Sequence, residues 1–471
     1  MIDLRRPAQR TFGEGLIAEE TTGLWEPWMR QADRILEDEQ LIQAVQEALL
    51  KRRPKSRTRG RRGYPAEIVL RMLLLKHIRN WSFGELEREV RPNLVYREFT
   101  RIGSGKVPDA KALGRQAQAL DPEVVEQIHR RVVELAVEHK VVQGRKMRVD
   151  TTVCETNIHY PTDSGLLGDG DRVLTRLMKK VTAIAGAVGT KVRDSMRNVQ
   201  RRVAEIARVS RTKGEQGKKK LQPLYGKLLG ITKRVVAQAK RFSAEIASGV
   251  KRSSDILQQA KLHALKSRID DMVGTVKKVI HQTKERIFGG NTHVEGKILS
   301  VFETTTEVIR KGKASKPTEF GKMIKIQEAE NQIVIDFEVY DQRPSDSDLL
   351  IPAIETHQTL LGRTPDLAAA DAAFYSAKNV AKAEEMGVKR VSVPNRSTKS
   401  AARKQFQKQR WFKKGQKWRT GCEGRISLLK RRHGLRRSLY KKDAGIKRWV
   451  GLGVISDNLI NLGKAMGKAM K

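Results

Sequence analysis

The sequence predicts a mixed α/β protein. An all-helical N-terminal domain precedes a mixed sheet with flanking helices, and a long basic helical insertion interrupts the sheet. Apolar residues recur at helical spacing in the first 145 residues, short strand-like runs alternate with helical segments after residue 146, and an amphipathic stripe begins at 171. We therefore divide the chain into four parts: a helical N-terminal region (1–145), the first core strand (146–170), the insertion (171–290) and the remaining core (291–465).

The N-terminal region is predicted to contain helices at 23–50, 65–79, 82–90 and 121–140. Ser82 and Glu85 have the spacing of a capping box, and Asp121 with Pro122 opens the last helix. Residues 51–62 hold eight Lys or Arg in twelve positions, which favours a linker or an arm that contacts phosphates.

The insertion follows a short strand at 146–153 and a Gly/Asp-rich loop at 163–171. Apolar residues at steps of three, four or seven predict helices from 171 to 286, with a break at 214–223. A long helical hairpin or small bundle with a basic outer face fits this pattern. A coiled-coil spacer with solvated charges is the alternative, and the net positive charge favours DNA contact.

The rest of the core is predicted to open with strands at 297–304, 321–328 and 332–340, the last two joined by a hairpin turn at 329–331. Helix 346–361, strand 366–371, helix 376–386, strand 388–393 and helix 419–432 follow. Antiparallel strands followed by alternating helices and strands are typical of a mixed sheet with helices packed on it.

The charge of the chain indicates a polyanionic partner. The formal net charge is +41; residues 171–286 hold 29 Lys or Arg against 9 acids, and residues 396–448 hold 20 against 2. Positive charge concentrated in two segments is the footprint of a nucleic-acid backbone. No apolar stretch of about 18 residues exists and no signal peptide is evident, so we expect a soluble intracellular protein. Its two cysteines suit a reducing cytoplasm.

Three acids stand out as candidates for metal-dependent phosphodiester chemistry, which needs carboxylates that converge from different elements. Asp150 interrupts the first core strand, Asp371 ends the apolar run DLAAAD, and Glu423 is one of two acids in 396–448. Each has a plain structural alternative: a turn residue for Asp150, a helix cap for Asp371 and a surface ion pair for Glu423. The combination favours a shared site for Mg²⁺, which prefers oxygen ligands.

The spacing around Glu423 adds two cations to this set. Arg419, Glu423 and Lys430 project from one face of the predicted helix, so the two cations can bind phosphates on either side of the carboxylate.

The segments around these residues resemble an insertion-sequence DDE transposase with an RNase H-like core, close to the ISNCY-type group. They are RVDTTV around Asp150, EFGKMIKIQ, IVIDFEVYD, DLAAADAAFYSAKN around Asp371, and CEGRISLLKRRHGL around Glu423, followed by GLGVISDNLINLG. The run GYPAEIVLRMLLLKHIRNWSFGELEREV resembles the helical region that such transposases place before the core. The resemblance covers most of the chain outside the insertion.

The transposase signature Tyr-x2-Arg-x3-Glu-x6-Lys is matched by Arg419, Glu423 and Lys430, whereas Gln416 stands at the tyrosine position. Trp411 and Trp418 are nearby aromatic residues able to stack on a base, although neither is in register with that position.

The resemblance implies an enzyme that cuts DNA at element ends and joins it to target DNA. It implies that Asp150, Asp371 and Glu423 hold Mg²⁺, with Mn²⁺ able to substitute, and that Arg419 and Lys430 bind DNA phosphates. It also implies DNA binding by the N-terminal helices, a homodimer or larger synaptic complex, and a place in the bacterial cytoplasm with the nucleoid.

Three other interpretations remain open. A metal-dependent nuclease without strand transfer would share every residue named above. A non-catalytic nucleic-acid-binding protein would keep the charge and leave the acids inert. The third makes Cys154 and Cys422 metal ligands with His159 or His433, but one cysteine per segment lacks the paired spacing of a zinc site, which favours buried core cysteines.

Overall fold

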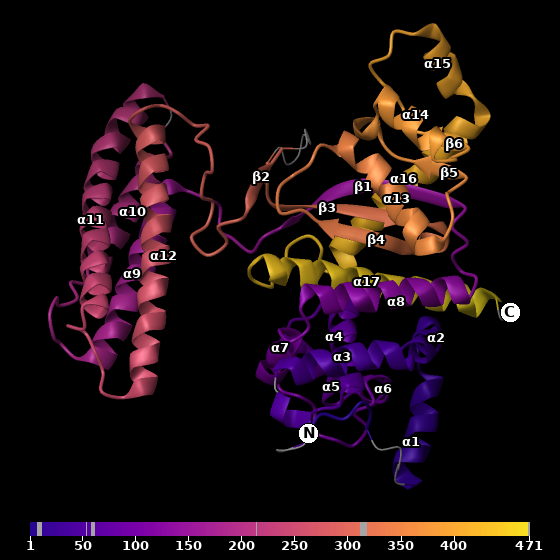
Figure 1. Ribbon diagram of the computed structural model, residues 1–471, viewed down its shortest axis with the longest axis horizontal. Coiled ribbons are helices and arrows are strands. Elements are labelled where there is room, and N and C mark those ends of the chain that lie inside the picture. Colours follow the sequence, from indigo (N-terminus) through magenta and orange to yellow (C-terminus); the bar gives the residue numbers. More distant parts are fainter. Residues whose placement is uncertain (7–11, 53, 58–61, 213, 311–317, 470–471) are drawn as a thin grey trace. The chain divides into compact units, whose positions relative to one another are not determined.

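The computed structural model describes residues 1–6, 12–52, 54–57, 62–212, 214–310 and 318–469 (Figure 1). The chain forms two compact units. The first comprises Met1–Asn157 and Val308–Lys471, and the second comprises Ile158–Glu307. Each unit buries apolar residues of its own. Of the predicted basic stretch at 51–62, residues 53 and 58–61 lie outside the described part of the chain.

The first unit opens with helices, as the apolar spacing predicts. They are α1 (Phe12–Gly23), α2 (Pro27–Ile35), α3 (Glu39–Arg52), η1 (Pro54–Arg57), α4 (Ala66–Arg79), α5 (Phe83–Val90), α6 (Leu94–Phe99), α7 (Ala110–Ala117) and α8 (Pro122–Glu138). The predicted capping box is confirmed, because Ser82 and Glu85 satisfy each other's backbone N–H at the start of α5.

The single helix predicted at 23–50 is wrong: α2 ends at Ile35 and α3 begins at Glu39. Asp38 causes the break, because its carboxylate accepts a hydrogen bond from the Leu41 backbone N–H (3.1 Å) at the start of α3.

The mixed sheet consists of β1 (Lys146–Glu155), β2 (Glu307–Ile309), β3 (Glu319–Glu328), β4 (Val334–Val339), β5 (Leu367–Ala369) and β6 (Arg390–Ser392). Its order is β2-β3-β1-β5-β6, and β4 also pairs with β3. Strand β1 is antiparallel to β3 and parallel to β5, which is parallel to β6. The predicted hairpin is confirmed as β3 and β4, with Asn331 in the left-handed region (φ 52°) at its turn. The mixed α/β class is thereby confirmed.

Helices pack on both faces of this sheet (Figure 1). The helical elements of this part of the chain are η2 (Glu330–Gln332), η3 (Asp346–Leu349), α13 (Leu350–Leu361), η4 (Ala372–Phe374), α14 (Ala377–Glu385), α15 (Ala401–Lys408), α16 (Arg410–Arg432) and α17 (Asp443–Ala469), of which η2 and α15 bury none of their residues. Met147, Val149 and Val153 of β1 pack with α13 and α14. Cys154, on the opposite side of the strand, packs with α16 and α17. This is the alternation expected of a strand buried on both faces.

Helix α17 was not predicted, and it joins the sheet to the N-terminal helices. Its buried residues Leu452, Ile455 and Leu459 share one core with apolar residues of α2, α4 and α8. The N-terminal helices and the sheet therefore form one compact unit.

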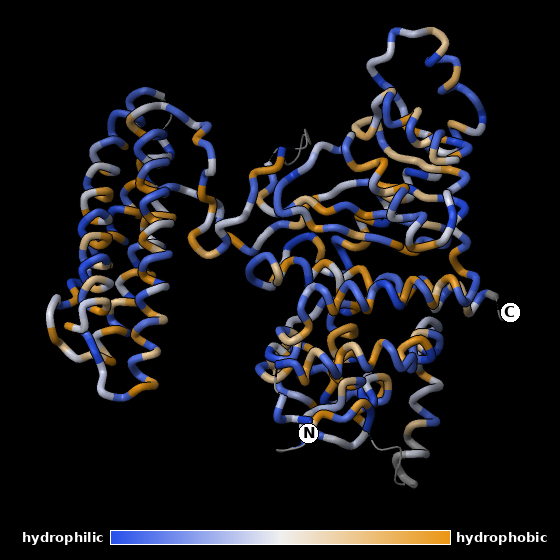
Figure 2. The backbone as a smooth tube through the Cα atoms, viewed as in Figure 1, coloured by the Kyte–Doolittle hydropathy of each residue, from blue (hydrophilic) through white to orange (hydrophobic). Residues whose placement is uncertain are grey.

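The second unit consists of four helices: α9 (Asp163–Ala185), α10 (Met196–Val209), α11 (Glu215–Ala247) and α12 (Ile256–Ile287). Hydrophobic and hydrophilic positions alternate along them (Figure 2), as the amphipathic stripe predicts. The loop predicted at 163–171 is wrong, because Thr162 caps α9 and Leu166 and Leu167 join the bundle core. The predicted break between helices exists but lies earlier than 214–223: α10 ends at Val209, and α11 begins after Gly214 (φ 84°) and accommodates Pro223 in its interior.

The strand predicted at 297–304 is absent, and these residues complete the core of the second unit. Ile298 packs among the four helices, and its backbone N–H and carbonyl bind the side chain of Gln282. The hydroxyl of Ser300 accepts hydrogen bonds from the backbone N–H groups of Phe302 and Glu303, which turns the chain. Within the described chain, each helix is too short or too polar to span a bilayer.

Candidate active site

Asp150 lies on β1, and Asp371 lies two residues beyond the end of β5, the parallel neighbour of β1. Arg148 of β1 pairs with Ala369, the last residue of β5. Asp150 lies two residues after Arg148, and Asp371 lies two residues after Ala369. Side chains alternate along a strand, so Asp150 shares the α16 face of β1 with Arg148 and Cys154.

Asp371 also acts as the cap that its sequence position suggested. One of its carboxylate oxygens accepts a hydrogen bond from the Ala373 backbone N–H (2.8 Å) at the start of η4. Asp150 similarly accepts one from the Thr151 N–H (2.7 Å). Each backbone bond engages one oxygen and orients the carboxylate.

Helix α16 supplies Glu423, and Arg419 connects it to the sheet. The guanidinium of Arg419 lies 2.8 Å from a Glu423 carboxylate oxygen and 3.8 Å from one of Asp150. Arg419 is 9% exposed, whereas 57% of the Glu423 side chain is exposed. The two carboxylates therefore flank one buried guanidinium, which supplies their counter-charge.

Asp150, Asp371, Glu423 and Lys430 line one cavity of about 1340 Å³. The amine of Lys430 lies 4.0 Å from a carboxylate oxygen of Glu319 on β3. Further arginines line the same cavity: Arg310, Arg343, Arg431, Arg436 and Arg437. A concave surface that combines converging carboxylates with surrounding cations can accept a phosphodiester while keeping acidic groups beside it.

Asp346 also lines this cavity, as do Glu85, Glu155 and Glu319, and the sequence did not single it out. Its oxygen accepts a hydrogen bond from the Thr151 hydroxyl (2.8 Å), next to Asp150 on β1. In the sequence, Asp346 lies in the polar run SDSD at the start of the helix predicted at 346–361, where acids usually serve as caps.

The donor set suits a hard divalent cation, because every carboxylate on the cavity offers oxygen ligands. Among the described residues, no three His, Cys, Asp or Glu side chains are grouped closely enough to hold a metal ion as they stand. In this arrangement the guanidinium of Arg419 is the ion-pair partner of both Asp150 and Glu423.

The cysteines do not extend the donor set. Cys154 and Cys422 are fully buried, as the sequence favoured. Burial raises the pKa of the Cys154 thiol to about 12 and raises that of Cys422 as well, as expected of thiols packed in an apolar core.

Gln416, at the tyrosine position of the transposase signature, holds α16 against the ends of two strands. Its side-chain amide donates hydrogen bonds to the carbonyls of Ala370 (3.2 Å) and Ser392 (2.5 Å). Ala370 directly precedes Asp371, so this contact fixes the helix that carries Glu423 relative to Asp371.

A buried ion network fixes the same helix from its other side. Arg425 of α16 binds Asp457 of α17 (2.8 Å) and lies 3.3 Å from Glu328 of β3. Glu328 also pairs with Arg148 of β1, whose guanidinium donates to the Trp418 carbonyl (2.6 Å). These charges are buried, and their mutual pairing compensates for lost hydration.

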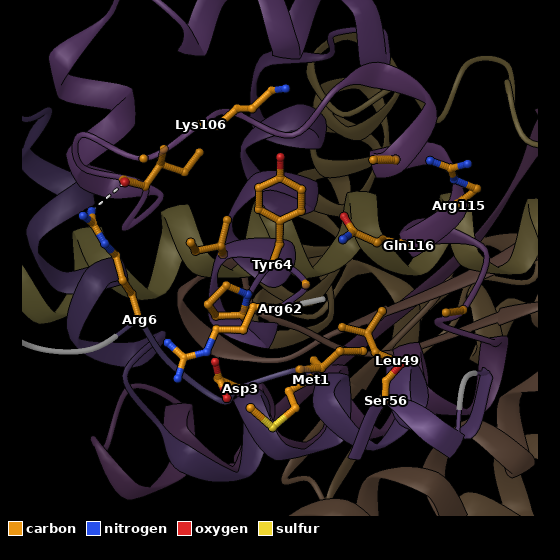
Figure 3. Close-up of a pocket in the computed structure, with 18 of the residues that line it drawn as sticks. Met1, Asp3, Arg6, Leu49, Ser56, Arg62, Tyr64, Lys106, Arg115 and Gln116 are labelled. Carbon is orange, nitrogen blue, oxygen red and sulfur yellow. Dashed lines mark hydrogen bonds between the residues drawn. The ribbon is translucent and has the colours of Figure 1, made fainter. Parts of the chain in front are cut away.

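A separate cavity of about 770 Å³ lies among the N-terminal helices (Figure 3). The ring of Tyr64 points into it, and Arg6, Arg62, Lys106 and Arg115 surround it. Arg6 donates a hydrogen bond to the Ile102 carbonyl (2.6 Å). This cavity does not include the three predicted acids, so we assign the candidate chemistry to the carboxylate-lined cavity on the sheet.

Comparison with known families gives one match, and it lies in the helical part of the first unit. Residues 27–118 match the family model described as Transposase domain (DUF772). No curated protein and no solved structure matches the chain. The matched segment runs from α2 through α7, contributes most of the cavity around Tyr64, and ends before β1. It therefore indicates a DNA-processing enzyme and supports a transposase family for this chain.

Proposed function

We propose that this protein is a DDE-type DNA transposase that cuts DNA at element ends and transfers the cut strand into target DNA. The observation that carries the proposal is that Asp150, Asp371 and Glu423, far apart in sequence, line one cavity with basic surroundings. The transposase family match in the helical region supports it independently.

An RNase H-like core accords with the arrangement of the sheet. The resemblance implies a first aspartate on strand one, a second after strand four and a glutamate on a later helix. Asp150 lies on β1, Asp371 follows β5, and Glu423 lies on α16. Counting β1, β3, β4 and β5 as the core strands, with β2 as a short edge strand, gives the implied order.

Asp150, Asp371 and Glu423 would hold Mg²⁺ or Mn²⁺, which would polarise the scissile phosphate and activate the attacking hydroxyl. Arg419 changes partner in this proposal: it leaves the carboxylates and binds a DNA phosphate as DNA and metal arrive. Lys430 binds a second phosphate, and the arginines around the cavity hold the flanking backbone.

The reaction has two steps. Water first hydrolyses the phosphodiester at the element end and leaves a 3′-hydroxyl. That hydroxyl then attacks a target phosphodiester, so a new bond forms and a target 3′-oxygen leaves. Both ends of the element must be paired for this, so we expect a homodimer or a larger synaptic complex.

The test uses duplexes copied from the DNA on either side of the reading frame, with Mg²⁺ or Mn²⁺. We expect wild-type protein to nick them and to join pre-cut ends to a target plasmid. Asp150→Asn, Asp371→Asn and Glu423→Gln should each lower the nicking rate at least about a hundredfold, because each removes a negative charge that would balance the positive charge of the metal ion. DNA affinity in EDTA should remain.

Glu355→Gln is the matched control, because Glu355 is an exposed acid on α13 outside the cavity. Nicking without joining would reject the transposase in favour of a nuclease. If wild-type protein binds DNA but cleaves it with neither Mg²⁺ nor Mn²⁺, both enzymatic functions are rejected, and a non-catalytic DNA-binding protein remains.

A further inference from the structure

A second groove runs beside the N-terminal half of α16, and its residues are distinct from those of the carboxylate-lined cavity. We call it the tryptophan groove, after Trp411 and Trp418 in its lining. It encloses about 880 Å³, within the range of roughly 300–1,000 Å³ typical of ligand sites. Six cations line it: Arg145, Lys146, Lys389, Arg390, Arg410 and Lys414.

One face of α16 forms a wall of this groove. Trp411, Lys414, Gly415 and Trp418 follow the i, i+3, i+4, i+7 spacing of a single helical face. Gly415 allows this face to approach the sheet, because a Cβ there would lie 2.7 Å from the hydroxyl of Ser392. Arg419 follows about 100° around the helix and turns toward the carboxylates, so α16 serves both sites.

The charge of the tryptophan groove is largely unneutralised. Its one acidic lining residue, Asp366, pairs with Lys389 (3.0 Å). Arg145, Lys146, Arg410 and Lys414 are exposed and form no ion pair with any other described residue. Cations gathered in a concave surface without acidic partners attract a polyanion.

The two indole rings provide stacking surfaces among these cations. Trp411 and Trp418 are half-buried, with the guanidinium of Arg390 5.9 Å from the first ring centre and that of Arg148 4.8 Å from the second. The step of seven positions from Trp411 to Trp418 separates them by about 10 Å along the helix axis, so they offer separate platforms for two bases of one strand. Aromatic platforms in a cationic groove are the usual means of binding single-stranded nucleic acid.

The groove and the carboxylates lie toward opposite ends of the parallel strands. The groove is lined by Lys146, Leu367 and Arg390, the first residues of β1, β5 and β6. Asp371 lies four residues beyond Leu367, a distance of about 13 Å along an extended chain. This span separates the groove from the carboxylates and keeps both within reach of one DNA substrate.

We propose that the tryptophan groove binds an unpaired segment of the DNA substrate, with bases stacked on Trp411 and Trp418 and phosphates bound by the cations. This inference rests on the proposed DNA-processing function. The bases of a duplex are stacked on one another and hide the faces that indole rings need, so the rings favour an unpaired strand.

The test compares a fluorescent 20-nucleotide thymidine strand with a 20-base-pair duplex, both bound by the full chain in EDTA. Arg410→Glu with Lys414→Glu should weaken single-strand binding at least tenfold and reduce the slope of log affinity against log salt by about 1.4, since two phosphate contacts are lost. Lys413→Glu with Lys417→Glu is the matched control: it makes the same charge change at exposed positions of α16 outside the groove and should bind as wild type does.

Trp411→Phe with Trp418→Phe provides a second readout that does not depend on charge. It should lower single-strand affinity several-fold and abolish most of the tryptophan quenching that the thymidine strand produces. The inference is overturned if the groove variants lose as much affinity for the duplex as for the single strand. It is also overturned if the control variant loses as much single-strand affinity as the groove variants do. The proposed function is tested separately, by the cleavage assay with Mg²⁺ or Mn²⁺, and it fails if wild-type protein cleaves no duplex there. The binding measurements contain no metal ion, so their outcome does not depend on cleavage.

Discussion

Gln416 shows how one side chain positions the helix that carries Glu423. Its amide binds the carbonyls at the ends of β5 and β6, beside Asp371. The sequence marked this position only by the absence of a tyrosine. In the fold, an amide suits it because its N–H groups donate to two carbonyls at once, which a phenol with one hydrogen cannot do.

Gln416→Ala should therefore destabilise the first unit by about 1–3 kcal/mol, because it removes the side-chain donor of the Ala370 carbonyl and one of the two donors of the Ser392 carbonyl. Nicking should fall as well, since α16 is no longer fixed relative to Asp371. Chemical denaturation and the nicking assay measure the two effects. Lys417→Ala, at the exposed neighbouring position, is the control, and a Gln416→Ala protein as stable as this control would refute the positioning role.

At the scale of elements, the bundle of α9 to α12 carries a buried carboxylate in its core. Asp171 of α9 is fully buried, and its one hydrogen bond to a described residue comes from the Thr232 hydroxyl of α11 (2.9 Å). Burial raises the pKa of Asp171 from 3.8 to about 7, although the bond from Thr232 acts in the opposite direction. The folded bundle therefore holds this carboxyl in its protonated form in acid and must ionise it near neutral pH.

The sign of the pH dependence follows from this raised pKa. Between about pH 4 and 7 the unfolded chain ionises Asp171 while the folded bundle keeps the proton, so its contribution to stability falls by about 1.4 kcal/mol per pH unit and levels off above pH 7. Asp171→Asn should remove this slope and stabilise the bundle at pH 8 relative to wild type. Denaturation at pH 5, 6, 7 and 8 measures the difference; Asp271→Asn, an exposed acid of α12, should retain the wild-type slope.

At the scale of the whole molecule, the chain has two compact units with separate sets of buried residues. Units with their own cores unfold as separate cooperative transitions. The Arg425 network belongs to the first unit and joins α16, α17 and β3. Asp171 belongs to the second.

Calorimetry of the full chain should accordingly show two transitions. Arg425→Met should lower the midpoint of one of them, because it removes the cation that Glu328 and Asp457 share in the buried interior and leaves Glu328 only Arg148 as an ion-pair partner, at a cost of about 3–5 kcal/mol. Asp171→Asn at pH 8 should raise the midpoint of the other. A single transition that both variants shift would contradict two independent cores.

Local patterns were predictable wherever one short segment contains its own stabilising contacts. The capping box of Ser82 and Glu85, the cap at Asp121 and the hairpin between β3 and β4 depend on residues a few positions apart.

Predictions failed where packing against residues distant in the sequence determines the local structure. Residues 297–304 look like a strand, yet Ile298 packs in the core of the four helices, where its backbone N–H binds Gln282, 16 residues earlier in the chain. Helix α17 was missed because it is buried between the sheet and the N-terminal helices, so its apolar residues show no single amphipathic face.

The amino-acid sequence by itself established the basic character of the chain, most of its helices and strands, and the three unusual acids. Charge, helical spacing and strand alternation can be recognised from residues that lie close together in the sequence. Only the tertiary structure decided that Asp150, Asp371 and Glu423 line one cavity, that Asp346 joins them, and that Arg419 lies between two of the acids. It likewise gathered the cations around Trp411 and Trp418 from three separate segments. The physical reason is that strand pairing and helix packing bring together residues hundreds of positions apart, and no local pattern encodes which ones meet.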